Sequence, residues 1–206
     1  MPGRHGRNFL RNKRLATDQQ RSVPCGTASS GSSSSTSVFS SCHSLQDYWD
    51  HEAPMLLAAT VAEINKPFPY KEMLATLTLC PIQSMSRPLL INICPFLDGP
   101  TQQKPRPMFL FSALVFHELL HTYVLRARSQ GTSALLERYK SEEPIVKNHL
   151  HLMAVMKMVY LNLGRAEQLQ QIIETDSASD NPAYRRAWQI VNEIEGHQTF
   201  TQELMQ

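Results

Sequence analysis

The residues best suited to chemistry are His117, Glu118 and His121, in the sequence Phe-His-Glu-Leu-Leu-His-Thr. Histidines four positions apart lie on one face of a helix, so both imidazoles can point at a single metal ion. Zinc binds imidazole nitrogen well, and a glutamate beside the first histidine is placed to act as a base towards a metal-bound water. Bound zinc lowers the pKa of that water to about 7 and polarises a carbonyl group. This HExxH pattern therefore predicts a zinc site with hydrolytic chemistry.

The segment that carries the motif is otherwise apolar. Residues 108–125 are the longest apolar run of the chain, and burying three ionisable groups in it is costly unless they are paired or bind metal. The run is long enough to span a bilayer, but intramembrane metalloproteases need several spanning segments, and no second such run is found. We therefore expect a buried helix and no membrane span. Two histidines and a glutamate hydrogen-bonded at a helix end are the alternative.

A zinc site needs a third protein ligand, and the next helix offers several. The pair Glu143-Pro144 predicts the start of a helix that continues over residues 145–163. A buried face drawn through its apolar residues includes His149 and puts His151 on the opposite side. His149 is therefore the favoured ligand. The alternatives are His151, Glu143 and Glu142.

Other polar residues are candidates for supporting roles. Tyr123 and Tyr160 can donate a hydrogen bond to the oxyanion that forms when water attacks a carbonyl, although a buried structural role is commoner for tyrosine. Asn148 can orient a neighbouring ligand, with solvation as the alternative. Glu195 and His197 follow the last amphipathic run, and we expect them to be solvated.

The remaining sequence predicts the elements that position these residues. Residues 47–65 have the pattern of an amphipathic helix, and prolines at 67 and 69 end it. Two strand-like runs follow at 74–79 and 89–94, with a connection at 81–88 between them. After the two central helices, residues 165–173 and 184–195 predict two more helices around a loop at 176–182. We expect an α/β (α+β) fold, mostly helical, with a small mixed sheet before the HExxH helix.

The order of these elements resembles the gluzincin branch of the zincin metallopeptidases, to which the catalytic domains of thermolysin and the membrane-alanyl-type aminopeptidases belong. In that family a mixed sheet ends in an edge strand that binds the substrate backbone, the zinc helix follows, and a second helix carries the last ligand. The likeness spans residues 67–163, with Ser84-Met85-Ser86 in the sheet region, and HExxH is its specific motif. The family's last ligand is a glutamate, where this chain has Asn148-His149. The exopeptidase signature Gly-x-Met-Glu-Asn is not found.

Composition and charge limit the other classes of function. The 20 basic and 18 acidic residues are too balanced to predict a nucleic-acid partner. The cysteines Cys25, Cys42, Cys80 and Cys94 have no metal-ligand spacing, and we expect reduced thiols, with a Cys80–Cys94 bridge as the alternative. No glycine-rich phosphate loop and no CxxCH motif is found, so the sequence does not indicate a nucleotide, flavin or haem.

The chain divides by composition into two parts. Residues 1–44 are rich in arginine and serine and poor in acidic residues, and we expect a disordered tail or a targeting segment. Residues 45–206 are expected to form a single zincin-like metallohydrolase domain. The expected localisation is cytoplasmic, with organellar import through the N-terminal segment as the alternative.

These observations together predict a zinc-dependent metallopeptidase that acts on a peptide or protein substrate. In this hypothesis His117, His121 and His149 hold Zn²⁺, and Glu118 activates the bound water. An exposed strand edge would bind a peptide through main-chain pairing. The alternatives are a non-catalytic helical interaction protein and a degenerate zincin that keeps zinc as a structural element. The sequence does not indicate the substrate or the oligomeric state.

Overall fold

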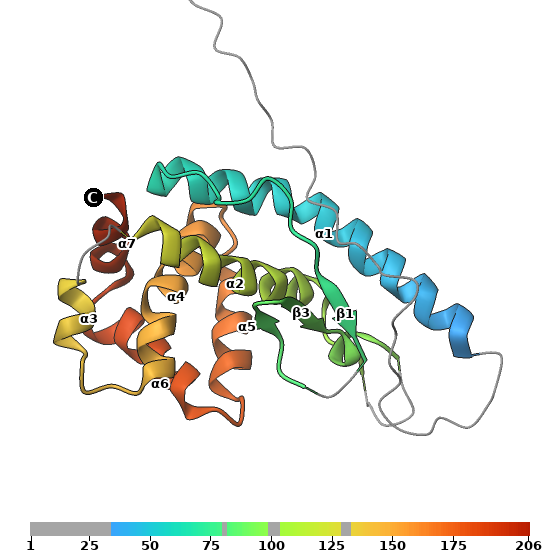
Figure 1. The fold of residues 1–206 in the computed structure, drawn as a ribbon. Coiled ribbons are helices and arrows are strands. Elements are labelled where there is room, and N and C mark those ends of the chain that lie inside the picture. Colours follow the sequence, from blue (N-terminus) through green and yellow to red (C-terminus); the bar gives the residue numbers. More distant parts are fainter. Residues whose placement is uncertain (1–33, 80–81, 99–103, 129–132) are drawn as a thin grey trace, which may run out of the picture.

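The computed structural model describes residues 34–79, 82–98, 104–128 and 133–206, with side chains from residue 42 onward. The fold is mostly helical, with one small mixed sheet of three strands, which confirms the predicted fold class. In Figure 1 helix α1 lies along one side of the molecule, α2 runs beneath it, and α4, α5 and α6 lie on the far side of α2. The sheet lies against one end of α2, so α2 contacts both the sheet and the other helices.

Helix α1 (Ser34–Ile64) begins earlier than the sequence pattern indicated. Residues 34–44, which were assigned to the tail, are helical, because no glycine or proline interrupts residues 32–53. The helix ends at Asn65, whose φ of 57° is tolerated by asparagine, and Pro67 follows. Leu45 and Trp49 are each only 1% exposed and attach α1 to the core. Residues 1–33, the rest of the predicted tail, lie outside the described part.

Three short strands make the sheet. The strands β1 (Thr76–Thr78) and β3 (Leu89–Asn92) pair in parallel, and β2 (Met85–Ser86) pairs antiparallel with β3, which gives the order β1-β3-β2. The two predicted strands are therefore confirmed at their centres. The connection predicted at 81–88 contains β2, because Met85 and Ser86 align with Leu90 and Leu89. A one-turn 3-10 helix, Cys94–Phe96, follows β3.

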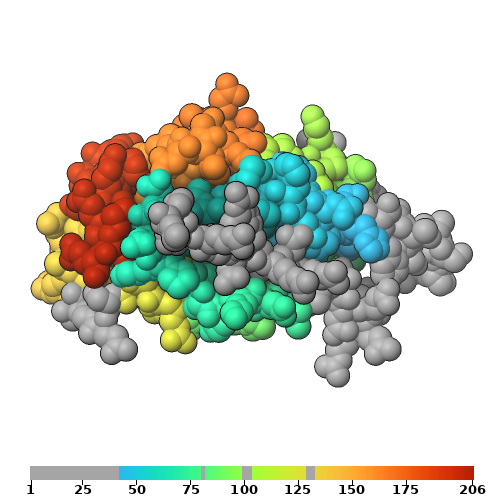
Figure 2. All heavy atoms as spheres, turned by 90° about the horizontal axis from the view of Figure 1, so that it is seen from above, coloured from blue at the N-terminus to red at the C-terminus, as the bar shows by residue number. Residues whose placement is uncertain are grey.

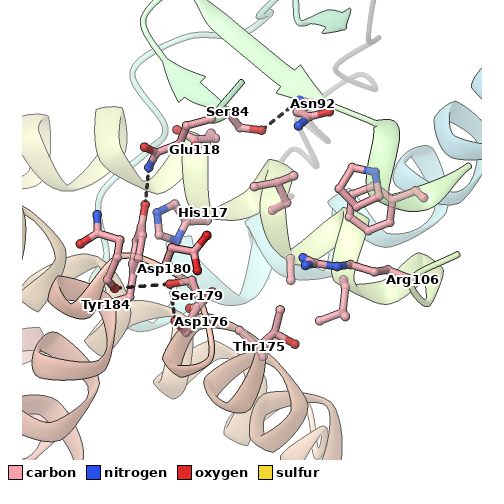
Figure 3. Close-up of a pocket in the computed structure, with 18 of the residues that line it drawn as sticks. Ser84, Asn92, Arg106, His117, Glu118, Thr175, Asp176, Ser179, Asp180 and Tyr184 are labelled. Carbon is pink, nitrogen blue, oxygen red and sulfur yellow. Dashed lines mark hydrogen bonds between the residues drawn. The ribbon is translucent and has the colours of Figure 1, made fainter. Parts of the chain in front are cut away.

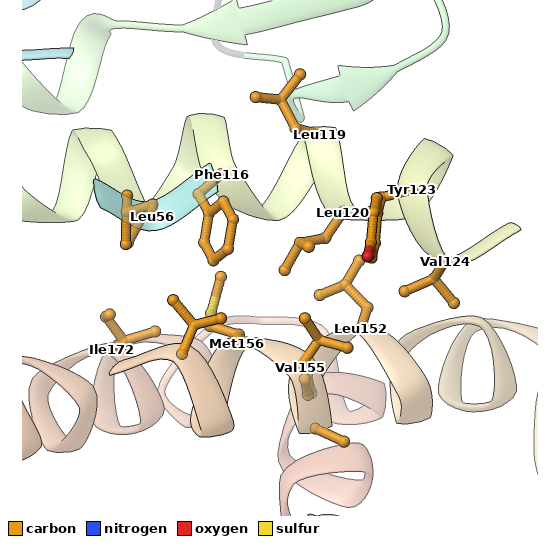
Figure 4. Packing of buried hydrophobic residues seen from close by; sticks show 14 of the residues in the cluster. Leu56, Phe116, Leu119, Leu120, Tyr123, Val124, Leu152, Val155, Met156 and Ile172 are labelled. Atoms are coloured by element: carbon orange, nitrogen blue, oxygen red, sulfur yellow. The ribbon is translucent and has the colours of Figure 1, made fainter. Parts of the chain in front are cut away.

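Helices α2 (Met108–Ala127) and α4 (Pro144–Asn162) form the centre of the core, and both were predicted to within two residues at each end. Phe116 and Leu120 of α2 pack on Leu152, Val155 and Met156 of α4, and each of the five is at most 1% exposed (Figure 4). Such burial contributes about 1.5–3 kcal/mol for each large apolar side chain. Helix α2 is long and apolar enough to span a membrane, but 67% of its most apolar window is buried inside the fold, as in a core helix.

Four shorter helices and a π-helical turn complete the described fold: α3 (Ala134–Arg138), α5 (Ala166–Ser177), α6 (Pro182–Gln189), the π-helical turn Ile190–Ile194 and α7 (His197–Met205). The sequence pattern indicated α5 and α6 but missed α3 and α7. Seen from above, the red C-terminal residues and the orange residues around the α4–α5 connection lie beside α1 (Figure 2). Helix α4 therefore contacts α1, α2, α5, α6 and α7 and is the central helix of the molecule.

The described cysteines are free. Cys42 and Cys94 are both unpaired thiols, as expected, and burial raises the pKa of each. Cys25 and Cys80 lie outside the described residues, and with them the alternative of a Cys80–Cys94 bridge.

Candidate metal centre

Three histidines from two helices meet between α2 and α4. His117 and His121 are one turn apart on α2, with ring centroids 5.0 Å apart, and His149 of α4 lies 5.1 Å from the first ring and 4.8 Å from the second. One ligand nitrogen from each ring lies within 4.8 Å of the others. The structure therefore brings together a buried histidine triad that could hold a metal ion.

The hydrogen bond of His149 defines which nitrogen is free to bind. Its Nδ1 lies 2.7 Å from the carbonyl oxygen of Ile145, and because a carbonyl only accepts, Nδ1 carries the proton and donates it. Nε2 then has a lone pair, and it is buried without a hydrogen-bond partner among the described residues. Leaving such an atom unpaired costs about 1–3 kcal/mol. A backbone carbonyl that accepts from one ring nitrogen and so fixes the tautomer, together with a free Nε2, is typical of a metal-ligating histidine.

The charges of the triad also suit a metal. Burial lowers the pKa of His117 well below its usual value, and the neighbouring His149 and His121 lower it further. Burial lowers the pKa of His121 to about 4, and it lowers the pKa of His149 against the opposing effect of the Ile145 carbonyl. All three rings are therefore neutral at pH 7, which is the form that binds metal.

Glu118 lies beside the triad and is only 6% exposed. Burial raises the pKa of its carboxyl group from 4.5 to about 7. A carboxyl group in that range can both accept and release a proton near neutral pH. Glu118 also lines the adjoining pocket, whereas no ligand atom of Glu118 belongs to the histidine cluster.

A pocket of about 410 Å³ opens beside the triad (Figure 3), and it is lined by His117 but not by His121 or His149. One wall is a single face of α2, since its lining residues recur at spacings of three and one: Leu110, Ala113, Leu114, His117 and Glu118. The other walls come from α5 and α6, the 3-10 helix after β3, and the segment before β2: Ile172, Thr175, Asp176, Tyr184, Pro95, Phe96, Gln83 and Ser84. His117 and Glu118 therefore lie in a pocket that has an apolar wall.

Tyr184 is one of the pocket residues that the sequence did not reveal. Its ring centroid lies 4.8 Å from that of His149 and 6.0 Å from that of His117. Gln83 Nε2 donates a hydrogen bond of 2.8 Å to Tyr184 Oη, and since no acceptor for the hydroxyl proton is found in the described part of the chain, that proton can be donated into the pocket. Burial and the carboxylates of Glu118 and Asp176 raise the pKa of Tyr184, so the hydroxyl stays protonated. The Asn181-Pro182 helix start was readable in the sequence, but not the direction in which this tyrosine points.

The two tyrosines proposed from the sequence do not line the pocket. Tyr123 Oη donates to the carbonyl oxygen of Lys66 at 2.8 Å, and burial raises the pKa of Tyr123 to about 12. Tyr160 is 1% exposed, and its pKa is raised by burial. Both are structural residues of the core. Asn148 is exposed to solvent, in agreement with the alternative given above.

The other candidate third ligands have different partners. His151 is 1% exposed on the far side of α4, where its Nε2 donates to Glu203 Oε2 at 2.6 Å. His151 is buried although it lies opposite the apolar face drawn from the sequence, because residues 149–156 of α4 are buried on every side. Glu142 accepts hydrogen bonds from Arg186, and Glu143 is an exposed residue at the start of α4. Neither carboxylate joins the histidine cluster.

Glu195 differs from the expectation of a solvated side chain. Tyr139 Oη donates to it at 2.9 Å, and Arg138 forms an ion pair with it. These bonds hold α3 to the turn before α7. His197 is half-buried, and burial lowers its pKa.

No protein-family model, no curated protein and no solved structure matches this chain. Of the resemblance to gluzincins, the structure supports the part that it tests, which is a histidine triad able to hold a metal ion.

Proposed function

We propose that this protein is a zinc-dependent hydrolase, and specifically a metallopeptidase of the zincin type. His117, His121 and His149 hold the metal, and Glu118 is the general base. The observation that carries the proposal is the buried, neutral histidine triad with a proton-exchanging carboxyl group beside it and a pocket that His117 and Glu118 line.

The donor set supports zinc as the metal. Three neutral imidazoles are suitable ligands for zinc and leave a fourth coordination position for water or substrate. Ligand nitrogens in a tetrahedral site with Zn–N bonds of about 2.1 Å lie roughly 3.4 Å apart. One nitrogen from each ring of the triad lies within 4.8 Å of the others, which is compatible with that spacing. The unpartnered Nε2 of His149 gains a partner when metal binds.

The protein side chains supply the remaining chemistry. Zinc, when bound, acts as a Lewis acid that polarises a carbonyl group and lowers the pKa of a coordinated water. Glu118 accepts the proton of the attacking water and later returns it to the leaving amine. Tyr184 donates its free hydroxyl proton to the oxygen that becomes negatively charged.

The sheet edge favours a peptide as substrate. Strand β2 is an edge strand, since the order is β1-β3-β2, and it lies against α2. Its outer backbone groups have no strand partner among the described residues. An extended peptide could pair with this edge and present its carbonyl group to the triad.

Elemental analysis of the purified protein tests the metal. We expect about one zinc ion per chain in the wild type and in Glu118→Gln, and none in His117→Ala or His149→Ala. His43→Ala is the matched control, because His43 is exposed on α1 and lies outside the triad. A wild-type protein that takes up no zinc even after reconstitution would refute the proposal.

Cleavage of a mixed peptide library tests the reaction. Glu118→Gln should lower kcat by about a hundredfold or more while keeping its zinc, because loss of a general base costs 10²–10⁴-fold. Tight zinc binding without hydrolysis by the wild type would instead identify a structural zinc, and absence of both would favour the helical interaction protein.

A further inference from the structure

Asp176 contributes a carboxylate to the pocket wall and is not part of the histidine triad. It lies in the last full turn of α5 and lines the same pocket as His117 and Glu118 (Figure 3). Trp188 Nε1 donates a hydrogen bond of 2.9 Å to Asp176 Oδ2. Among the described residues, Oδ1 has no hydrogen bond and no ion pair. One oxygen of a partly buried carboxylate is therefore available to a ligand in the pocket.

Asp176 lines the same pocket as Tyr184 and Glu118 (Figure 3). A group that binds Asp176 thus lies within reach of the reacting end of the pocket. Asp180, which is exposed at the rim, adds a second negative charge. Arg106 lines the opposite wall and its charge lowers the pKa of Asp176, but no ion pair joins it to either aspartate within the described residues.

The anchoring of Trp188 does not by itself require a charge at this position. A neutral amide oxygen would accept the same indole hydrogen bond. Burial instead makes the charge costly and raises the pKa of Asp176 to about 6, while Trp188 and Arg106 oppose that shift. The carboxylate is still mostly ionised at pH 7.5. An ionised group in a pocket with apolar walls favours a ligand that brings an apolar stem and a cation.

We propose that Asp176 makes this pocket select peptides with a lysine or arginine side chain beside the cleaved bond. The aliphatic stem packs along Leu110, Leu114 and Ile172, and the cationic end donates to Asp176 Oδ1. This inference rests on the proposed metallopeptidase function, because it assigns the substrate class of that site.

The test compares quenched fluorescent peptides that differ only in lysine or norleucine beside the cleaved bond. Norleucine keeps the stem and removes the charge. The wild type should prefer the lysine peptide by about tenfold in kcat/KM, as expected for one charge-assisted hydrogen bond. Asp176→Asn should abolish this preference while keeping the indole hydrogen bond. Glu174→Gln is the matched control, since Glu174 is an exposed carboxylate on the same helix that does not line the pocket, and it should keep the preference.

Binding to the zinc-loaded protein separates failure of this inference from failure of the proposed function. Calorimetry with the two peptides is paired with the indole N–H resonance of Trp188, which should shift only with lysine. Equal cleavage of both peptides by the wild type would overturn the selection and leave the peptidase intact. Selective binding without cleavage would overturn the peptidase and retain Asp176 as a basic-peptide site. If the protein neither cleaves the peptides nor binds the lysine peptide selectively, both the inference and the proposed function are overturned. The wild-type comparison stands even if Asp176→Asn fails to fold.

Discussion

Replacement of His149 by leucine tests whether this buried imidazole is a metal ligand or an ordinary core residue. Without metal, the leucine removes an unpartnered Nε2 that costs about 1–3 kcal/mol and also a hydrogen bond to Ile145 worth about 1 kcal/mol. Leucine is also close to histidine in volume. The free energy of unfolding of metal-free His149→Leu should therefore lie between the wild-type value and about 2 kcal/mol above it.

With zinc the order reverses. At a zinc concentration one hundred times Kd, the wild type gains about 2.7 kcal/mol, whereas a variant without one of three ligands gains almost nothing. At 2–4 °C for each kcal/mol in a domain of this size, Tm of the wild type should rise by about 5–10 °C. Urea unfolding and calorimetry, each in chelator and in zinc, measure both quantities. His43→Leu is the control and should respond to zinc as the wild type does.

Two results would refute this reasoning. A zinc-dependent rise in Tm that is unchanged in His149→Leu would exclude His149 as a ligand and return attention to the alternatives. A loss of several kcal/mol in the metal-free variant would mean that the imidazole is needed for packing, as in a helical protein without metal.

Three further predictions follow from single contacts. Tyr184→Phe should keep its zinc and lower kcat by about a hundredfold in the peptide assay, because it removes one oxyanion donor; an unchanged kcat would contradict this role. The raised pKa of Asp176 means that the folded state binds its proton more tightly than the unfolded state, so stability is lost as pH rises from about 4 through 6. Asp176→Asn should thus be more stable than the wild type at pH 8 by up to about 3 kcal/mol and nearly equal at pH 3.5, as measured by urea unfolding at each pH. Arg165→Met should lower the free energy of unfolding by about 3 kcal/mol at pH 7, because it leaves Glu52, which is 7% exposed, with only the exposed His51 as a charged neighbour; a loss below 1 kcal/mol would count against a buried pair.

The sequence predicted the elements whose signals are local. The apolar runs of α2 and α4 and the proline at the start of α4 gave their ends to within two residues, because periodicity and breakers act over a few positions. The predicted start of α1 at residue 47 was wrong, because the serine-rich composition before it was given more weight than the absence of glycine and proline there. Strand β2 was missed because two residues carry no period of their own and pair only when β3 is beside them.

For the candidate site, the sequence by itself determined the pairing of His117 with His121, because a spacing of four fixes two side chains on one helix face whatever surrounds them. The sequence favoured His149 over His151 from the apolar face of α4, but the meeting of His149 with the other two histidines and the pairing of His151 with Glu203 depend on how the helices pack. The same holds for Tyr184 and Asp176, which lie far along the chain from the triad. Their places depend on how α5 and α6 pack against α2 and α4, and that packing arises from long-range contacts that no local pattern encodes.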